Sequence, residues 1–259
     1  MEVKTVKHYA GLVDMGCFSR KDTVELTGGT EAANSMLYSY KKKGLIESVR
    51  RDLFVTISLE TKQPIPSRYA IASHIADDAY ITNHSAFEYY GLVNQLYYEV
   101  YVASASQFRS FEYDGVTYRR VLPAVDKGVV KNRDGVRATD MERTVLDGIN
   151  DFDKIAGLEE FMRCMELIPH LNGDKLFSYL MDYDLGFLYQ KTGYVLEYFK
   201  KQLSLSDAFF NACRAKIPKS KRYFYHGLQY ENHVLVHDWL LYVPEDLSAV
   251  TRKGGGYVK

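Results

Sequence analysis

The sequence predicts a mixed α+β protein of two domains, residues 1–62 and 63–259. Helical patterns and strand patterns follow one another without the regular alternation of a βαβ protein. Pro64 and Pro66, in "SLETKQPIPSR", mark the linker, because proline and the residue before it disfavour regular structure. A length of 259 residues with 46 % hydrophobic content is sufficient for two hydrophobic cores.

Two helices are predicted at the start of the chain. The first covers residues 3–14, and the second begins in "FSRKDTVELTGG". Ser19 is a good N-cap for the second helix, and Asp22 falls at the third helical position, close to a capping-box pattern. Gly28 and Gly29 then end this helix.

A third helix is predicted over residues 31–43, capped by Thr30 and ended by Gly44. At about 100° per residue, one side of this helix is apolar and is predicted to be buried. That side contains Ala33, Met36, Leu37 and Tyr40, and the opposite side carries Glu31, Asn34, Ser35, Tyr38 and Lys42.

A β-hairpin is predicted next, in "LIESVRRDLFVTI", with Arg51-Asp52 at its turn. Two helices joined by Gly28-Gly29-Thr30 and followed by a hairpin are the sequence outline of a winged helix-turn-helix. We therefore expect residues 1–62 to be a winged helix-turn-helix DNA-binding domain and residues 63–259 to be a larger α+β domain.

DNA contacts are predicted on the polar side of the third helix and on the hairpin. Asn34 and Ser35 are suited to base edges, and Tyr38 is suited to a phosphate. The predicted DNA-binding residues are Thr30, Asn34, Ser35, Tyr38, Ser39, Lys41, Lys42, Arg50 and Arg51.

Two alternatives remain open for this segment. Lysines at a helix C-terminus also interact favourably with the helix dipole, so the lysine run can be a solvated helix end without a ligand. The domain can also be a protein-interaction module without DNA binding, which would dock a partner through Tyr38 and Tyr40.

The second domain is predicted to contain strands, then helices, then strands. "RSFEYDGVTYRRVL" is a hairpin with Asp114-Gly115 as a two-residue turn, which is the strongest hairpin signal in the chain. "ATDMERTVLDGI" opens a helix, with Thr139 as the N-cap and Glu142 at the third position. Further elements are predicted as helices over 69–76, 84–91, 154–168, 173–182 and 189–202, a strand in "LYYEVYVAS", and extended segments in "RYFYHGLQYENHVLVHDWLLYVP".

Enzyme signatures are not found, and we expect neither catalysis nor a cofactor. The sequence has no Gly-Lys dipeptide for a phosphate loop, no G-x-S-x-G and no H-E-x-x-H. His233 and His237 could face the same side of an extended segment, but histidines on a hairpin are far more often structural than metal ligands, so no metal is expected. Asp140 and Glu142 could act as an acid–base pair. However, the capping box explains Glu142, and Asp140 in the first turn suits the helix dipole.

Charge and cysteine content limit the location and the partners. Lys plus Arg equals Asp plus Glu, 33 each, so a phosphate-binding surface must be a local patch. The basic tracts 127–137 and 214–222 could belong to such a patch or be solvated loops. Three widely spaced cysteines, Cys17, Cys164 and Cys213, favour a reducing cytosol. No signal peptide is expected, and no apolar run is long enough to cross a membrane, so we expect a cytoplasmic protein without membrane contact.

Four segments together resemble the AbiEi-type antitoxins of type IV toxin–antitoxin, or abortive infection, systems. The resemblance rests on "TGGTEAANSMLYSYKKKGLIESVRRDLFV", "ITNHSAFEYYGL", "ATDMERTVLDGI" and "HDWLLYVP". It implies a transcriptional regulator that binds double-stranded DNA at its own promoter and represses its operon. It also implies that the C-terminal domain counteracts a nucleotidyltransferase toxin without a tight complex. The family offers no catalytic residues to transfer.

Overall fold

The computed structural model describes residues 7–93, 95–245 and 247, and it has the expected mixed α+β composition. The chain divides into two compact units. Unit 1 consists of Met1–Ile81, Tyr98–Leu122 and Lys131–Ala138, and unit 2 consists of Thr82–Tyr97, Pro123–Val130 and Thr139–Lys259. Residues 63–81 are thus in the same compact unit as the segment before them, and the domain limits 1–62 and 63–259 stay a prediction.

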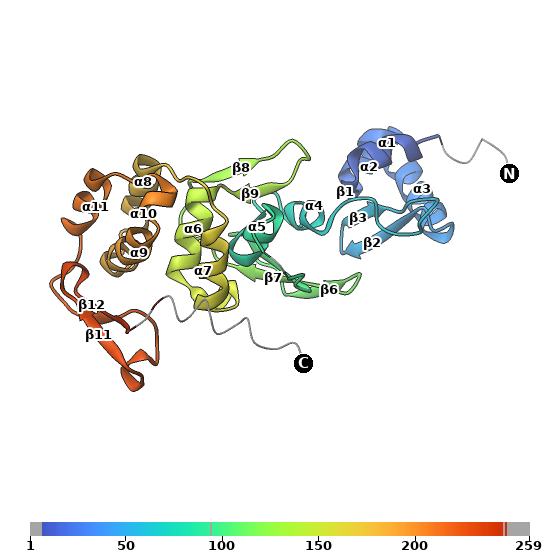
Figure 1. The fold of residues 1–259 in the computed structure, drawn as a ribbon. Coiled ribbons are helices and arrows are strands. Elements are labelled where there is room, and N and C mark those ends of the chain that lie inside the picture. Colours follow the sequence, from blue (N-terminus) through green and yellow to red (C-terminus); the bar gives the residue numbers. More distant parts are fainter. Residues whose placement is uncertain (1–6, 94, 246, 248–259) are drawn as a thin grey trace, which may run out of the picture. The chain divides into compact units, whose positions relative to one another are not determined.

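Three helices and a small antiparallel sheet form the N-terminal part of unit 1 (Figure 1). The sheet has the strand order β1-β3-β2, and its inner side chains share a core with the helices. The elements are α1 (Tyr9–Met15), β1 (Cys17–Phe18), α2 (Arg20–Thr27), α3 (Thr30–Lys42), β2 (Ile46–Arg50) and β3 (Leu53–Thr56). The first predicted helix begins in residues outside the described part of the chain.

Local capping places α2 as the sequence predicts. The Ser19 side chain accepts from the Asp22 backbone N–H, and the Asp22 carboxylate accepts from the Ser19 backbone N–H, so a complete capping box is present. Gly28 ends the helix in the left-handed conformation, with φ of 80°. The prediction that Thr30 caps α3 is wrong, because the extended Gly29 is already the N-cap and Thr30 is the first helical residue.

The predicted buried side of α3 is confirmed. Ala33, Met36, Leu37 and Tyr40 are its buried residues. The hairpin is also confirmed, since β2 and β3 pair antiparallel around Arg51 and Asp52.

A six-stranded sheet lies mostly in unit 1, with strand order β6-β7-β5-β4-β9-β8 (Figure 1). The predicted hairpin is confirmed, since β6 and β7 are antiparallel and Asp114 and Gly115 have φ of 50° and 70° at the turn. The predicted strand in "LYYEVYVAS" begins only at Glu99. The elements are α4 (Arg68–Ser73), β4 (Tyr80–Ile81), β5 (Glu99–Ala103), β6 (Phe111–Tyr113), β7 (Val116–Val121), β8 (Val129–Lys131) and β9 (Arg137–Thr139).

Unit 2 is mainly helical and contains a large core. The predicted helices are present with shifted ends, and the one expected over 189–202 is divided at Phe199. An additional helix, α11, was not expected. The helices are α5 (Asn83–Tyr89), α6 (Met141–Asn150), α7 (Leu158–Glu166), α8 (Gly173–Tyr183), α9 (Gly186–Tyr198), α10 (Lys200–Leu203) and α11 (Asp207–Arg214), with 3-10 turns at Phe152–Ile155, Leu228–Tyr230 and His237–Trp239.

The predicted capping of α6 by Thr139 and Glu142 is wrong. Thr139 is the last residue of β9, and Asp140 is the N-cap, whose side chain accepts from the Arg143 backbone N–H. Glu142 instead accepts from the Asn172 backbone N–H at 3.0 Å and from Lys175 Nζ at 2.9 Å. The strand therefore shifts the helix start by one residue and frees Glu142 for contacts with a different element.

The extended segments near the C-terminus form a sheet of order β10-β12-β11, as β10 (Arg222–Tyr223), β11 (His233–Val236) and β12 (Leu241–Pro244). Trp239, which follows β11, is fully buried. Its ring lies against α9 at Gly193, where an added Cβ would come within 2.1 Å of the Trp239 ring. Only glycine fits this contact without displacing the indole.

We predict that Gly193→Ala lowers the free energy of unfolding by about 1–3 kcal/mol, because the new methyl group overlaps a buried ring. Urea unfolding followed by the fluorescence of Trp239, the single tryptophan of the chain, measures this. Gly173→Ala in α8 is the matched control, since its Cβ meets Phe209 at an ordinary 3.5 Å. Equal stability of the two variants would contradict the contact.

Candidate nucleic-acid interface

Most of the predicted DNA-binding side chains are accessible on one side of α3 and at the hairpin turn. Tyr38 is 71 % exposed, which is unusual for a large aromatic side chain. Ser39 and Arg50 are half-buried. The exposed members of the predicted set are Thr30, Asn34, Ser35, Tyr38, Lys41, Lys42 and Arg51.

An open hollow of about 470 Å³ lies between α3 and the β2–β3 hairpin. It brings together four predicted residues, Asn34, Tyr38, Lys41 and Arg51, which come from two elements. The other predicted residues do not line it. The remaining lining residues are Arg20, Leu37, Ser48, Asp52 and Phe54, and we call this space the first hollow.

Arg20, which sequence reasoning missed, organises one side of the first hollow. Its guanidinium donates to Asn34 Oδ1, and its Nε lies 3.5 Å from Asp52 Oδ1. The side-chain oxygen of Asn34 is thereby occupied, and its amide N–H groups remain as donors for a base edge or a phosphate. The available signal was the position of Arg20, directly after the N-cap Ser19.

Arg50 occupies a different environment from Arg51. The Arg50 guanidinium lies over the rings of Phe108 and Phe111, at 5.4 and 5.5 Å from their centroids. Its Nη1 is buried without a hydrogen-bond partner. Arg50 therefore holds the hairpin against the β6 segment of the same unit, while Arg51 is exposed beside it.

The protein-interaction alternative requires Tyr40 to be accessible to a partner, and it is not. Its side chain is 6 % exposed and belongs to the core under α3. Only the Tyr38 part of that alternative has an accessible side chain.

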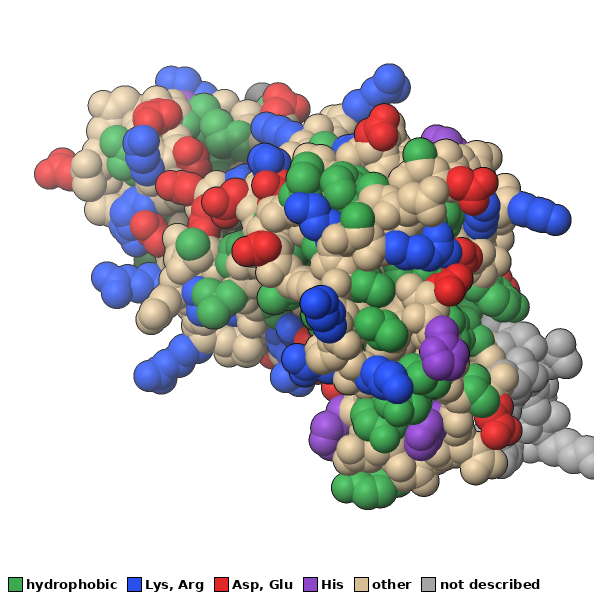
Figure 2. Space-filling model, turned by 90° about the vertical axis from the view of Figure 1, so that its left-hand side faces the viewer, with side chains coloured by type: hydrophobic (Ala, Val, Ile, Leu, Met, Phe, Trp, Pro, Cys, Tyr) green, Lys and Arg blue, Asp and Glu red, His purple; other side chains and the backbone are tan. Residues whose placement is uncertain are grey.

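The basic tract 214–222 lies in unit 2 and is partly engaged. Arg214 donates to Glu197 at 2.5 Å and lies over the Trp239 ring at 4.6 Å. On the face seen in Figure 2, basic and acidic side chains are interspersed. Lys219 and Lys221 of this tract are exposed.

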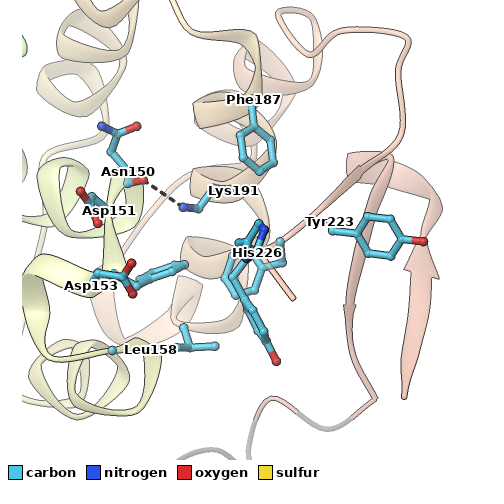
Figure 3. Close-up of a pocket in the computed structure, with 12 residues that line it drawn as sticks. Asn150, Asp151, Asp153, Leu158, Phe187, Lys191, Tyr223 and His226 are labelled. Atoms are coloured by element: carbon cyan, nitrogen blue, oxygen red, sulfur yellow. Dashed lines mark hydrogen bonds between the residues drawn. The ribbon is translucent and has the colours of Figure 1, made fainter. Parts of the chain in front are cut away.

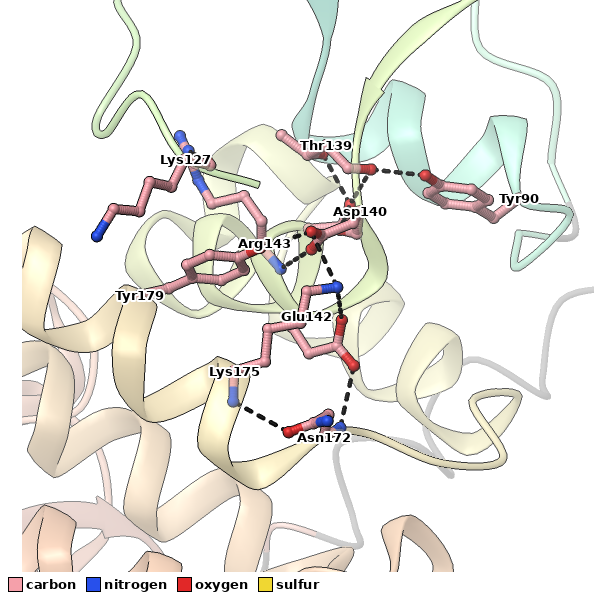
Figure 4. Close-up of polar contacts among 10 residues, drawn as sticks. Tyr90, Lys127, Thr139, Asp140, Glu142, Arg143, Asn172, Lys175 and Tyr179 are labelled. Carbon is pink, nitrogen blue, oxygen red and sulfur yellow. Dashed lines mark hydrogen bonds and ion pairs between the residues drawn. The ribbon is translucent and has the colours of Figure 1, made fainter. Parts of the chain in front are cut away.

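Asp140 and Glu142 belong to a polar cluster between α6 and α8 (Figure 4). Lys175 Nζ lies 3.1 Å from Asp140 and 2.9 Å from Glu142, and Tyr179 donates to Asp140 at 2.7 Å. Burial raises the pKa of Glu142, but the hydrogen bonds from Lys175 and Asn172 outweigh this and hold the pKa below its usual range. Contacts that join two helices account for both carboxylates.

A separate cavity, of about 610 Å³, lies in unit 2 around Lys191, and we call it the Lys191 cavity (Figure 3). Lys191 Nζ donates to the Asn150 carbonyl at 3.2 Å and lies 4.2 Å from the centroid of Phe152. Burial lowers the pKa of Lys191 to about 8, which Asp151 and Asp153 offset only in part. The ammonium therefore caps the C-terminal end of α6 at a considerable desolvation cost.

The C-terminal histidines do not form a metal site in the structure. The rings of Tyr223 and Tyr242 stack on each other, and His233 makes edge contacts with both, at 5.2 and 5.3 Å between ring centroids. Within residues 7–93, 95–245 and 247, no three His, Cys, Asp or Glu side chains are placed to hold a metal ion. None of the helices in this part of the chain is long and apolar enough to cross a membrane.

Comparison with known proteins gives information on the fold alone. No family model matches the chain, and no curated protein matches it either. Among solved structures, the chain is similar to the crystal structure of the RV2827C protein from Mycobacterium tuberculosis, with a TM-score of 0.63 and 14 % identity. The match covers 98 % of this chain and 96 % of the other, so the similarity in fold extends over nearly the whole length of both.

We predict that Lys191→Met changes the pH dependence of stability. In the folded protein the pKa of Lys191 is about 8, below the ordinary 10.5, so the unfolded chain binds more protons between these values. The buried charge of Lys191 destabilises the folded wild type, and this destabilisation is fully present below pH 8. The free energy of unfolding of wild type therefore rises as pH increases from 8 towards 10.5. The free energy of unfolding of the variant minus that of wild type should fall by about 2 kcal/mol between pH 8 and 10.

Urea titrations of both proteins at several pH values measure this difference. The subtraction cancels groups common to both proteins, including the Cys17, Cys164 and Cys213 thiols, whose burial raises their pKa to about 12. A difference that is constant with pH would contradict the assignment.

Proposed function

We propose that this protein is a DNA-binding transcriptional regulator and that residues 1–62 act as a winged helix-turn-helix. The observation that carries the proposal is the first hollow, where Asn34 and Tyr38 of α3 meet Arg51 of the hairpin. In this fold, the second helix of the helix-turn-helix enters the major groove and the hairpin lies against the neighbouring backbone. Helix α3 and the β2–β3 hairpin take these two roles.

In the proposal, the uncharged polar side chains and the basic side chains have different roles. Asn34 and Ser35 contact base edges, because amide and hydroxyl groups read the pattern of donors and acceptors in the major groove. Lys41, Lys42 and Arg51 contact phosphates, which hold the protein on the duplex without regard to sequence. We add Arg20 to this set of residues, because its guanidinium donates to Asn34 Oδ1 and so orients the Asn34 amide.

We further propose that the protein is the autorepressing antitoxin of a type IV toxin–antitoxin, or abortive infection, system. The support is the ordered set of four segments that resemble AbiEi-type antitoxins. Under this proposal the DNA partner is the protein's own promoter, and the functional partner is a nucleotidyltransferase toxin that is counteracted without a tight complex. Residues 63–259 then carry the neutralising function, and we assign no catalytic role to the polar cluster or to the Lys191 cavity.

The role of phosphate contacts is tested by changing Lys42 and Arg51 to Ala together. Each phosphate contact contributes about 0.9 to the slope of log affinity against log salt concentration, so the double variant should lose about 1.8 from this slope. Gel-shift titrations with a duplex from upstream of its own coding region, at several salt concentrations, measure the slope. Lys219→Ala in unit 2 is the control and should bind like wild type.

The selective role of Asn34 is tested with Asn34→Ala. This variant should lose about 1–3 kcal/mol of the preference for the upstream duplex over a scrambled duplex of equal length, while the salt slope stays the same. Unchanged preference would contradict base reading by Asn34. No salt-dependent binding of wild type to either duplex would overturn the proposed function.

A further inference from the structure

We propose that the DNA-contacting surface continues beyond α3 and the hairpin onto the turn between β8 and β9, where Lys131 and Arg133 contact a second stretch of phosphates. This inference rests on the proposed function and extends it to a segment about 80 residues further along the chain. The turn, residues 131–137, is called the 131–137 turn below. It is part of the basic tract 127–137, and the structure divides that tract in two.

Only part of the basic tract is available for a ligand. Lys127 lies in unit 2, and its Nζ pairs with Asp182 at 2.8 Å. The Arg137 guanidinium donates to the Asp77 carbonyl. Lys131 and Arg133 are exposed. Among the residues that the structure describes, neither side chain makes an ion pair or a hydrogen bond.

A second hollow connects the 131–137 turn with the proposed interface. It measures about 410 Å³, and its lining includes Lys21 of α2, Asp52 of the hairpin turn, and Lys131 and Arg137 of the 131–137 turn. Asp52 also lines the first hollow. The two hollows therefore adjoin at Asp52. In this proposal, a duplex bound at the first hollow extends towards the second.

A third hollow, of about 680 Å³, continues the same path. Lys131 lines both the second and the third hollow, and Arg133 lines the third, opposite the chain between α1 and β1. The three hollows are thus linked through Asp52 and Lys131, and Arg51, Lys131 and Arg133 all belong to unit 1. Cations distributed over adjoining hollows fit a polyanionic backbone better than they fit a compact ligand.

The 131–137 turn is held in place before any ligand binds. The Asn132 backbone N–H donates to the Val136 carbonyl at 2.8 Å, and the Val136 N–H donates to Asp134 at 3.1 Å. The Arg137 backbone N–H donates to Ser73 at 2.9 Å, which attaches the turn to α4. A turn fixed in this way loses little backbone conformational entropy when its side chains contact DNA.

The acidic groups near this path are partly neutralised by internal contacts. Asp22 is engaged in the capping box of α2, and Asp52 pairs with Arg20. Asp77 is the third carboxylate along the second hollow. Asp14 and Asp134 line the third hollow, and the Asp134 carboxylate accepts from the Val136 backbone N–H. Lys131 and Arg133 supply the positive charge for phosphate beside these carboxylates.

The experiment compares Lys131→Ala/Arg133→Ala with wild type in salt-dependent binding to the duplex from upstream of its own coding region. Two lost phosphate contacts should reduce the slope of log affinity against log salt by about 1.8. The region protected from hydroxyl-radical cleavage should shorten on one side only, and the preference over a scrambled duplex should stay. Lys219→Ala/Lys221→Ala, with the same charge change on exposed residues of unit 2, is the matched control.

The outcomes separate the inference from the function on which it rests. If wild type binds, and the Lys131→Ala/Arg133→Ala variant shows the same salt slope and protects the same length of duplex, the inference alone is overturned. An equal loss in the Lys219/Lys221 variant would also overturn it, because the effect would then be one of net charge. Absence of salt-dependent binding by wild type would overturn the proposed function and the inference together.

Discussion

The packing of one side of α3 against the small N-terminal sheet decides which residues this protein can present to a partner. Met36, Leu37 and Tyr40 enter the core with Ile46 and Phe54, and this burial fixes the rotation of the helix about its axis. Asn34, Ser35 and Tyr38 are exposed as a direct consequence. A rotation of α3 by one residue would bury polar groups without partners, which costs more than a typical hydrogen bond contributes.

Local charge, rather than total charge, is the second constraint. The chain is neutral overall, with 33 basic and 33 acidic residues. Internal pairing then determines which cations remain available. Arg50 is held by two aromatic rings and Arg137 by a carbonyl, while Arg51, Lys131 and Arg133 are exposed. Arg51, Lys131 and Arg133 line three hollows; the first and second share Asp52, and the second and third share Lys131.

Features set by neighbouring residues could be predicted from the sequence, and features set by distant residues could not. The Ser19–Asp22 capping box, the Asp114-Gly115 turn and the buried side of α3 all depend on residues within one or two turns of each other. Thr139 was misassigned as a helix cap because β9 extends to it. The environment of Arg50 could not be foreseen, because Phe108 lies 58 residues further along the chain. In the candidate site, the polar side of α3 and Arg51 could be predicted from periodicity and turn position. The role of Arg20 and the position of the 131–137 turn, whose basic tract the sequence shows, required the fold.

The central claim is that α3 and the hairpin turn touch DNA directly. Ultraviolet cross-linking of the full chain to the duplex from upstream of its own coding region, followed by mass spectrometry of the linked peptides, tests it most directly. The account predicts cross-links in the peptides that carry Asn34, Tyr38 and Arg51. Cross-links confined to unit 2, or no cross-links while the protein is bound, would contradict it.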